Sequence, residues 1–219
     1  GVGFICHIKG KQSHAIVSDA LTMLENMNHR GACGCEPDSG DGAGIMVRMP
    51  DSFFRAKMAA RGVNLPPPGQ YGVAMIFLPR SRKARLECER VFEQTVREYG
   101  MQVLAWRDVP VDHSQVGPTP RKTEPVIRQC FVAPTETFFN KADFDRRLYL
   151  VRQISENRLE FGDYSPEAKE EFYICICSAN RMVYKGMLTA HQVREYYLDL
   201  KDPTFESSLA IVHSRFSTN

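Results

Sequence analysis

The sequence has little of what would point to several large classes of protein. Its 219 residues include a single tryptophan, and no apolar run approaches the ~18–20 residues that a helix needs to cross a bilayer. We also expect no secretory signal peptide before the first apolar segment. The formal net charge is only +2, so no strong basic field would attract nucleic acid, and no block of like charge forms a tail. We therefore expect neither a membrane nor a nucleic acid as a partner.

The cysteines also lack a recognisable framework. There are seven of them, an odd number that argues against a set of paired disulfides. Cys175 and Cys177 alternate in an apolar run and Cys33 and Cys35 flank a glycine, so neither pair has the C-x-x-C spacing of a zinc or redox site. Cys6 lies inside the first apolar run without a neighbouring base and is not expected to be a nucleophile. Reduced thiols and a cytoplasmic location are the simplest interpretation.

Length and composition fit one large domain with a sizeable core, since 43% of the residues are hydrophobic and 25% are charged. The pattern contains no internal repeat. Elements expected from apolar periodicity and from capping or turn residues are helices over 14–29, 51–61, 81–99, 141–161 and 189–196, and strands over 1–6, 45–49, 70–78, 101–109, 126–133, 171–178, 182–185 and 209–213. The arginines of 81–99 are expected on a solvated face. The proline-containing stretch 110–125 is expected to be a long irregular loop, which is often functional.

The beginning of the chain is unusually apolar. Chain termini are usually polar and frayed, whereas residues 1–6 form a strand-like run with two glycines, where a side chain would crowd an approaching backbone or ligand. A buried N-terminus has a chemical explanation. In N-terminal-nucleophile enzymes the first residue attacks the substrate, and its own α-amine serves as the base.

Three parts of the sequence together carry a family resemblance. They are residues 1–5, residues 28–45 and residues 213–219, with the sequences Gly-Val-Gly-Phe-Ile, Asn-His-Arg-Gly-Ala followed by Ser-Gly-Asp-Gly-Ala-Gly-Ile, and His-Ser-Arg-Phe-Ser-Thr-Asn. They resemble the glutaminase domain of the glutamate synthases, which are class II glutamine amidotransferases. On its own, the glycine run at 40–44 could be mistaken for a phosphate-binding loop, but it lacks the Lys-Ser/Thr of one, and a tight turn into a strand is expected.

This resemblance implies a fold and a nucleophile. The alternation of helices and hairpin-linked strands leaves a doubly wound sheet and a helix-covered sandwich both open, whereas the resemblance implies an α+β fold, the four-layer αββα sandwich of N-terminal-nucleophile hydrolases. Residues 1–219 would be the N-terminal part of a single amidotransferase domain. The family's nucleophilic cysteine is expected immediately before Gly1, so no catalytic residue falls within this numbering. The family's oxyanion-hole Asn-Gly pair and its α-amine-binding aspartate would lie beyond Asn219.

The substrate-binding residues are assigned by the same resemblance. Arg215 is implied to bind the α-carboxylate of glutamine, for which a fork-shaped guanidinium is suited. Thr218 and the backbone after Phe216 are implied as further contacts, and Arg30 and Gly31 belong to a stretch that lines the glutamine site in the family. From the residues alone, Arg30 would be a cation at a helix C-terminus, and Arg215 an ordinary strand-end arginine.

A larger parent protein is implied as well. Ammonia would pass through a tunnel to a synthase domain of the same chain, which makes glutamate from 2-oxoglutarate and carries FMN and an iron–sulfur cluster. No cofactor and no metal is expected within the 219 residues. The implied partners are glutamine, the synthase domain and a small reductase subunit. The electron donor stays open between a reduced pyridine nucleotide and ferredoxin, and a plastid location would fit a plant source.

Two other functions are consistent with the residues. One is a catalytically inactive amidotransferase-like module that binds glutamine or docks a partner. The other is a different N-terminal-nucleophile amide hydrolase, which would not need Arg215 as a carboxylate clamp.

Overall fold

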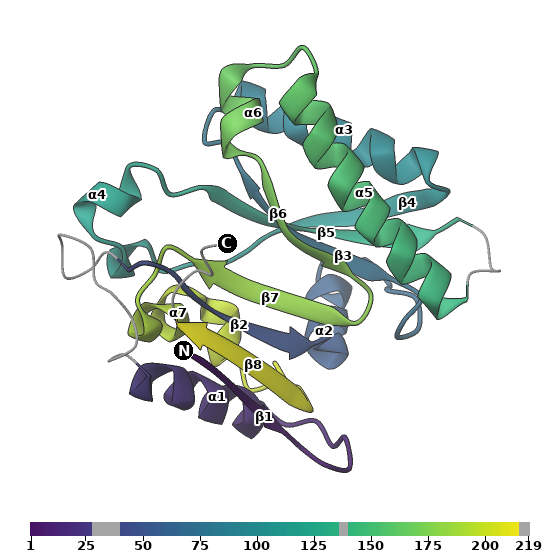
Figure 1. Cartoon of the computed structure of the whole chain (residues 1–219). Coiled ribbons are helices and arrows are strands. Elements are labelled where there is room, and N and C mark those ends of the chain that lie inside the picture. Colours follow the sequence, from purple (N-terminus) through teal and green to yellow (C-terminus); the bar gives the residue numbers. More distant parts are fainter. Residues whose placement is uncertain (28–39, 136–139, 215–219) are drawn as a thin grey trace. The chain divides into compact units, whose positions relative to one another are not determined.

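The computed structural model describes residues 1–27, 40–135 and 140–214, which fall into two compact units that each contain one four-stranded antiparallel sheet (Figure 1). The described residues of the first unit lie within Gly1–Phe54, Val109–Glu124 and Val183–Asn219, and those of the second within Arg55–Asp108 and Pro125–Met182. The expectation of an α+β fold is thereby confirmed.

The sheet of the first unit has the strand order β1 (Val2–Cys6), β8 (Leu209–Ser214), β2 (Ala43–Arg48) and β7 (Arg181–Gly186). Helix α1 (His14–Asn26) packs against β8 and β1, and α7 (Ala190–Tyr196) packs against β2. The buried residues of α1 recur at the predicted helical spacing, and they are Ile16, Val17, Ala20, Leu21 and Leu24. The helix ends at Asn26, before the predicted residue 29, and Met27 is its C-cap with a non-helical ψ of 8°; residues 28 and 29 lie outside the described residues.

Aromatic rings fill the centre of the first unit. Tyr184 and Tyr197 pack edge to face with ring centroids 5.1 Å apart, and Tyr184 packs in the same way on Phe205 at 5.5 Å. Their hydroxyls are satisfied: Tyr184 donates to the Asp199 carboxylate at 2.9 Å and Tyr197 to the Lys185 carbonyl at 2.7 Å. Asp199 lies on the short 3-10 helix η3 (Leu198–Lys201). Buried tyrosines with satisfied hydroxyls add packing without leaving a polar atom unpaired.

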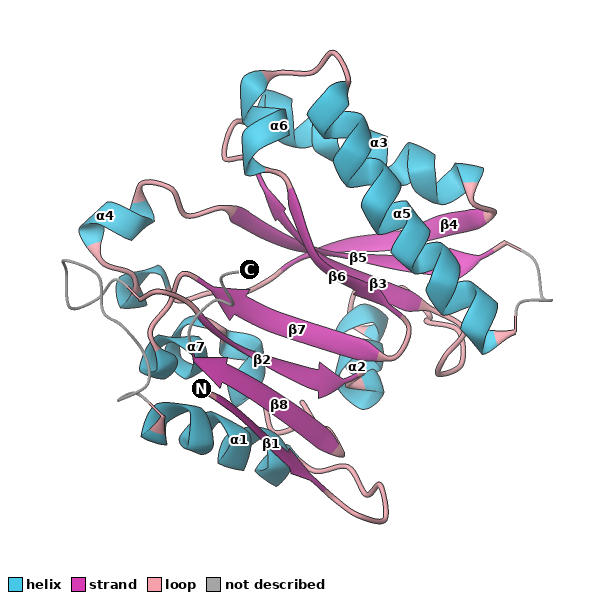
Figure 2. Ribbon diagram, viewed as in Figure 1, coloured by secondary structure: helices cyan, strands magenta, loops and turns pink. Residues whose placement is uncertain are grey.

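The sheet of the second unit has the order β4 (Met101–Asp108), β5 (Val126–Pro134), β3 (Gly72–Leu78) and β6 (Tyr173–Ser178). Helices α3 (Arg82–Glu98), α5 (Lys141–Phe161) and α6 (Pro166–Glu171) pack on one face of it (Figure 2). Ala74, Ile76 and Leu78 of β3 point into that packing. A β-bulge interrupts the pairing of β3 with β6 at Met75 and Ile76.

Most predicted elements are present, with small shifts of their ends. Helix α2 (Asp51–Ala59) is shorter than the predicted 51–61, and Gly62 follows it with a φ of 75°, which favours glycine. Thr189 caps α7 through a reciprocal pair of contacts with Gln192. Among the described residues, no helix is both long and apolar enough to span a membrane.

The segment 110–125 is more ordered than predicted. It contains the 3-10 helix η2 (His113–Gln115) and the short helix α4 (Pro118–Arg121). The Asp112 carboxylate caps η2 by accepting from the Ser114 N–H at 3.0 Å, and the Gln192 side chain of α7 donates to the Gln115 carbonyl at 2.7 Å. The expectation of an irregular loop was therefore wrong in this respect, because elements this short carry no detectable apolar period.

Candidate active site

One edge of the first unit's sheet gathers the ends of three strands. Strand β8 runs antiparallel to both β1 and β2, and Val2, His213 and Gly44 form one row across the three strands. In the next row, the Gly1 nitrogen donates to the Ser214 carbonyl at 2.8 Å, and the Ser214 N–H donates back to the Gly1 carbonyl at 2.8 Å. The starts of β1 and β2 therefore meet the end of β8 at this edge (Figure 1).

Helix α1 brings the chain back to the same edge. Its N-cap residue Ser13 forms a bridge with Ser207, which lies before β8 begins. At the other end of the helix, Met23 and Met27 face Gly3. A Cβ placed on Gly3 would lie 2.3 Å from the Met23 sulfur and 3.7 Å from the Met27 methyl. The C-terminal end of α1 therefore lies beside the start of β1, and the Met23 side chain occupies the space that a Cβ on Gly3 would take.

Gly40 and Gly42, which precede β2, are each required by the local backbone. A Cβ on Gly40 would lie 2.2 Å from the Leu188 carbonyl carbon and 2.4 Å from the Thr189 nitrogen, so two backbone segments touch there. Gly42 has a φ of 120°, a region that side chains rarely adopt. This confirms the predicted tight turn into a strand, and it explains the glycine run without a phosphate group.

Gly44 makes room for His213 on the neighbouring strand. A Cβ on Gly44 would lie 2.8 Å from the Nε2 of His213 and 2.6 Å from the Cβ of Lys185. The imidazole of His213 therefore lies over the glycine. Strand β8 runs one residue past the predicted 209–213, and Ser214, which is buried, ends it.

All five sequence-predicted binding residues lie outside the described residues; they are Arg30, Gly31, Phe216, Thr218 and Arg215. What the structure fixes are the positions from which their segments start. Residue 215 follows directly on Ser214, whose backbone is hydrogen-bonded to Gly1. Residues 28–39 connect the end of α1 to Gly40, which precedes β2.

Comparison with known families agrees with this arrangement. The model of the family described as "Glutamine amidotransferases class-II" matches the sequence over residues 1–219. The chain belongs to the class II glutamine amidotransferases. This confirms the resemblance seen in the three motifs, and the two antiparallel sheets with their helices are consistent with the N-terminal-nucleophile fold of that family.

Several relatives of this amidotransferase chain are glutamate synthases. The chain is 40% identical over 219 residues to the glutamate synthase [NADPH] large chain of Bacillus subtilis (strain 168), covering 100% of this chain and 14% of that one. It is 41% identical to the glutamate synthase [NADH] of Schizosaccharomyces pombe (strain 972 / ATCC 24843), with 100% and 10% covered. For the ferredoxin-dependent glutamate synthase 2 of Synechocystis sp. (strain ATCC 27184 / PCC 6803 / Kazusa), the identity is 39%, with 100% and 13% covered. The chain thus spans about a seventh of these relatives' length or less.

The thiols of the second unit are structural. Burial raises the pKa of Cys88 and of Cys177 to about 12, and it also raises the pKa of Cys130. Within the part of the chain that the structure describes, no group of three His, Cys, Asp or Glu residues could hold a metal ion. Cys175 is buried as well, whereas Cys6 is exposed at the end of β1.

Sequence reasoning missed one polar cluster in the first unit. Oε1 of Glu124 accepts from the Tyr196 hydroxyl at 2.7 Å and lies 2.8 Å from Nδ1 of His113. Burial, followed by the bond to Glu124, raises the pKa of Tyr196. The cluster joins the segment 110–125 to α7. In the sequence, Asp112 can be read as a residue that favours a turn, but nothing there indicates that Glu124 contacts His113 and Tyr196.

Proposed function

We propose that the chain is the first part of the glutamine-hydrolysing domain of a glutamate synthase. The observation that carries the proposal is the pairing of Gly1 with Ser214 at the sheet edge where β1, β2 and β8 meet. In a class II amidotransferase the nucleophile is the N-terminal residue. A cysteine attached to the Gly1 nitrogen would therefore start at this edge, one residue from the end of β8.

The proposed reaction uses the thiol and the α-amine of that cysteine. The amine accepts the thiol proton, and the sulfur attacks the side-chain amide carbon of glutamine. The carbon–nitrogen bond breaks, ammonia leaves with the proton, and a γ-glutamyl thioester remains. Water then cleaves the thioester to glutamate and restores the thiol. No oxidant or reductant takes part in this half-reaction.

The substrate-binding roles are proposed for the residues that continue from the described edge. Arg215 follows Ser214 directly and would bind the glutamine α-carboxylate through two parallel N–H···O bonds. Thr218 and the backbone after Phe216 would add contacts from the same segment. Arg30 and Gly31 would line the site from the segment between α1 and β2.

We further propose the parent protein from the relatives' names. Their titles include NADPH, NADH and ferredoxin-dependent glutamate synthases, so a synthase domain carrying FMN and an iron–sulfur cluster would use the ammonia. A small reductase subunit would serve a pyridine-nucleotide form. Residues 1–219 would form the N-terminal part of one four-layer αββα domain. The location would be the cytoplasm, or a plastid as in a chloroplastic relative from Oryza sativa.

An inactive amidotransferase-like module is the alternative that the family match leaves to be tested. It would have the same fold and would bind glutamine only reversibly, because no nucleophile would precede Gly1. A different amide hydrolase is disfavoured, since the family model that matches the whole chain is that of the glutamine amidotransferases.

The decisive experiment is intact-mass and N-terminal-peptide analysis of the natural full-length protein before and after an electrophilic glutamine analogue. We expect one adduct, on a cysteine that directly precedes Gly1. If Gly1 is the mature N-terminus and no adduct forms, the glutaminase proposal is wrong.

A matched pair of variants tests the clamp. Arg215→Lys keeps the charge but loses the bidentate geometry, so we expect KM for glutamine to rise about 10- to 100-fold, the equivalent of one charge-assisted hydrogen bond. Arg90→Lys changes an exposed arginine of α3 in the same way and should leave KM unchanged. An unchanged KM in Arg215→Lys would remove Arg215 from the binding site while leaving the nucleophile in place.

A further inference from the structure

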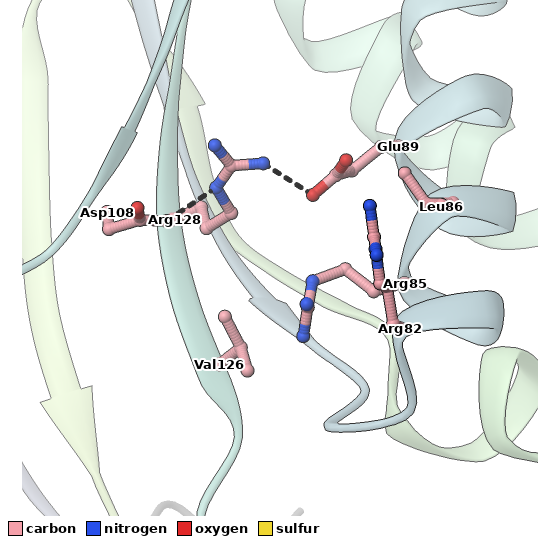
Figure 3. Close-up of a pocket in the computed structure, with 7 residues that line it drawn as sticks. All are labelled: Arg82, Arg85, Leu86, Glu89, Asp108, Val126 and Arg128. Carbon is pink, nitrogen blue, oxygen red and sulfur yellow. Dashed lines mark hydrogen bonds and ion pairs between the residues drawn. The ribbon is translucent and has the colours of Figure 1, made fainter.

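The second unit contains a cavity of about 370 Å³ that plays no part in the proposed function. Figure 3 shows its two sides. Helix α3 contributes the side chains of Arg82, Arg85, Leu86 and Glu89, while the end of β4 and the start of β5 contribute Asp108, Val126 and Arg128. The volume lies within the range of about 300–1,000 Å³ that small-molecule sites occupy.

The sheet side of this cavity is electrically balanced. Nη1 of Arg128 donates to the Glu89 carboxylate at 2.6 Å, and Nε of Arg128 lies 2.7 Å from the Asp108 carboxylate as an ion pair without hydrogen-bond alignment. The guanidinium also lies over the Trp106 ring, 5.1 Å from its centroid. Both carboxylates of the cavity are therefore committed to Arg128 (Figure 3).

The helix side is not balanced. Glu89 is turned toward Arg128 rather than toward Arg85, which precedes it by one helical turn. Nη1 of Arg85 donates only to the carbonyls of Pro79 and Arg80, each at 3.3 Å. Across residues 1–27, 40–135 and 140–214, no carboxylate forms an ion pair with Arg82 or Arg85. Two guanidinium charges thus line the cavity without a carboxylate partner among the described residues.

The helix backbone makes this excess of positive charge larger. Helix α3 begins at Arg82 after the N-cap Ser81, and its first turn contains no acidic residue. The first turn of a helix carries a partial positive charge and normally favours acidic side chains. Here Arg82 and Lys83 occupy it instead, so the sequence places cations where the helix disfavours them. An anion bound between α3 and β5 would remove that conflict.

The remaining wall of the cavity is apolar. Leu86 is 45% exposed, and Val126 is half-buried on the facing strand. Guanidinium groups bind carboxylate and phosphate oxygens in the same bidentate way. We propose that this cavity binds a small, multiply charged oxyanion metabolite, a dicarboxylate or a phosphate ester, whose anionic groups contact Arg82 and Arg85 and whose uncharged part lies against Leu86 and Val126. The proposal is independent of the glutaminase reaction.

The test is isothermal titration calorimetry on the full-length protein with inorganic pyrophosphate and succinate as probes and neutral succinamide as the control. We expect at least one of the two anions to bind and succinamide not to bind. The double variant Arg82→Gln/Arg85→Gln should weaken binding about 100-fold, roughly tenfold for each charge-assisted contact. The matched variant Arg90→Gln, on the exposed side of the same helix, should bind like the wild type.

The outcomes separate the alternatives. Preference for pyrophosphate would identify a phosphate ligand, and preference for succinate a dicarboxylate. Equal binding by the wild type and the double variant, with an unchanged unfolding midpoint, would overturn the proposal. Failure of both anions to bind at millimolar concentration would also overturn it.

Discussion

The edge strand of one sheet and a central strand of the other use their side chains differently. In β1, three of the five residues are exposed, including Val2 and Phe4 at 76% and 66%. In β3, six of the seven residues are buried, and the strand is paired on both sides. The expectation of a buried N-terminus was therefore wrong for the described residues: Gly1 is exposed, and β1 contributes little to the core of its unit.

The two units also differ in how their interiors are built. The second unit packs aliphatic, aromatic and neutral thiol side chains under α3, α5 and α6. The first unit buries tyrosines whose hydroxyls are bonded to carboxylates or carbonyls, such as Tyr184 and Tyr197. A polar interior is costly unless every group is paired. The second unit buries polar side chains as well, since Arg107 donates to Gln129 at 2.7 Å, and both interiors are mainly apolar.

We expect the largest loss of unfolding free energy when a buried phenylalanine of the second unit is replaced, and we compare it with an exposed phenylalanine of the first. Phe92 of α3 is fully buried and packs edge to face on Trp106 at 5.9 Å. Phe92→Ala should lower the free energy of unfolding by about 3–5 kcal/mol, because it leaves a cavity. Phe4→Ala should cost about 0.5 kcal/mol or less, since this ring is mostly in solvent. Urea unfolding followed by circular dichroism measures both.

The same two variants can also show that β1 is not an exposed strand in the full-length protein. If Phe4→Ala in the full-length protein costs as much as Phe92→Ala, another part of the protein covers the exposed face of β1. The first unit's edge strand would then be as much a core element as β3.

A second pair of variants tests the close contact between Gly40 and the backbone at Leu188 and Thr189. Gly40→Ala forces a Cβ to within 2.2 Å of the backbone at Leu188, and we expect a loss of about 1–3 kcal/mol. Gly186→Ala meets side-chain atoms and no backbone, with the Leu188 side chain at 3.3 Å and the Tyr197 hydroxyl at 4.0 Å, and should cost clearly less. Thermal unfolding of the two variants side by side gives the ranking, and an equal cost would show that the loop at Gly40 adjusts freely.

The sequence was sufficient for elements with long, clear periods. Helix α5 has the predicted bounds Lys141–Phe161, and the near-continuous apolar run over 70–78 predicted the strand β3. The sequence did not predict features that tertiary contacts determine. The early end of α1, the ordered turns within 110–125 and the bulge between β3 and β6 depend on packing partners that no local pattern specifies.

The candidate site shows the same division. Motifs alone identified the family, and the family match confirmed it. The row of Val2, His213 and Gly44, however, pairs residues about two hundred positions apart and follows only from the strand register. The arginines of α3 were expected on a solvated face, and Arg82 and Arg90 are exposed. That Arg82 and Arg85 also line a cavity beside Arg128 follows only from the packing of α3 on β5.

The smallest expected effect concerns the polar contact between α7 and the segment 110–125. Tyr196→Phe removes the hydroxyl that donates to Glu124 at 2.7 Å, and we expect a loss of about 1 kcal/mol at pH 7. The pKa of Tyr196 is raised in the folded protein by burial and by Glu124. A raised folded pKa gives stability that is fully present below the unfolded pKa of about 10 and declines above it, because only the unfolded chain then gains from ionisation.

The test is to measure the unfolding free energies of the wild type and of Tyr196→Phe at pH 7, 9 and 10.5. The wild type should lose its advantage over Tyr196→Phe as the pH passes about 10. Other tyrosines titrate equally in both proteins and cancel from the difference. A difference that stays constant across this range would mean that Tyr196 is not held neutral by burial and by Glu124.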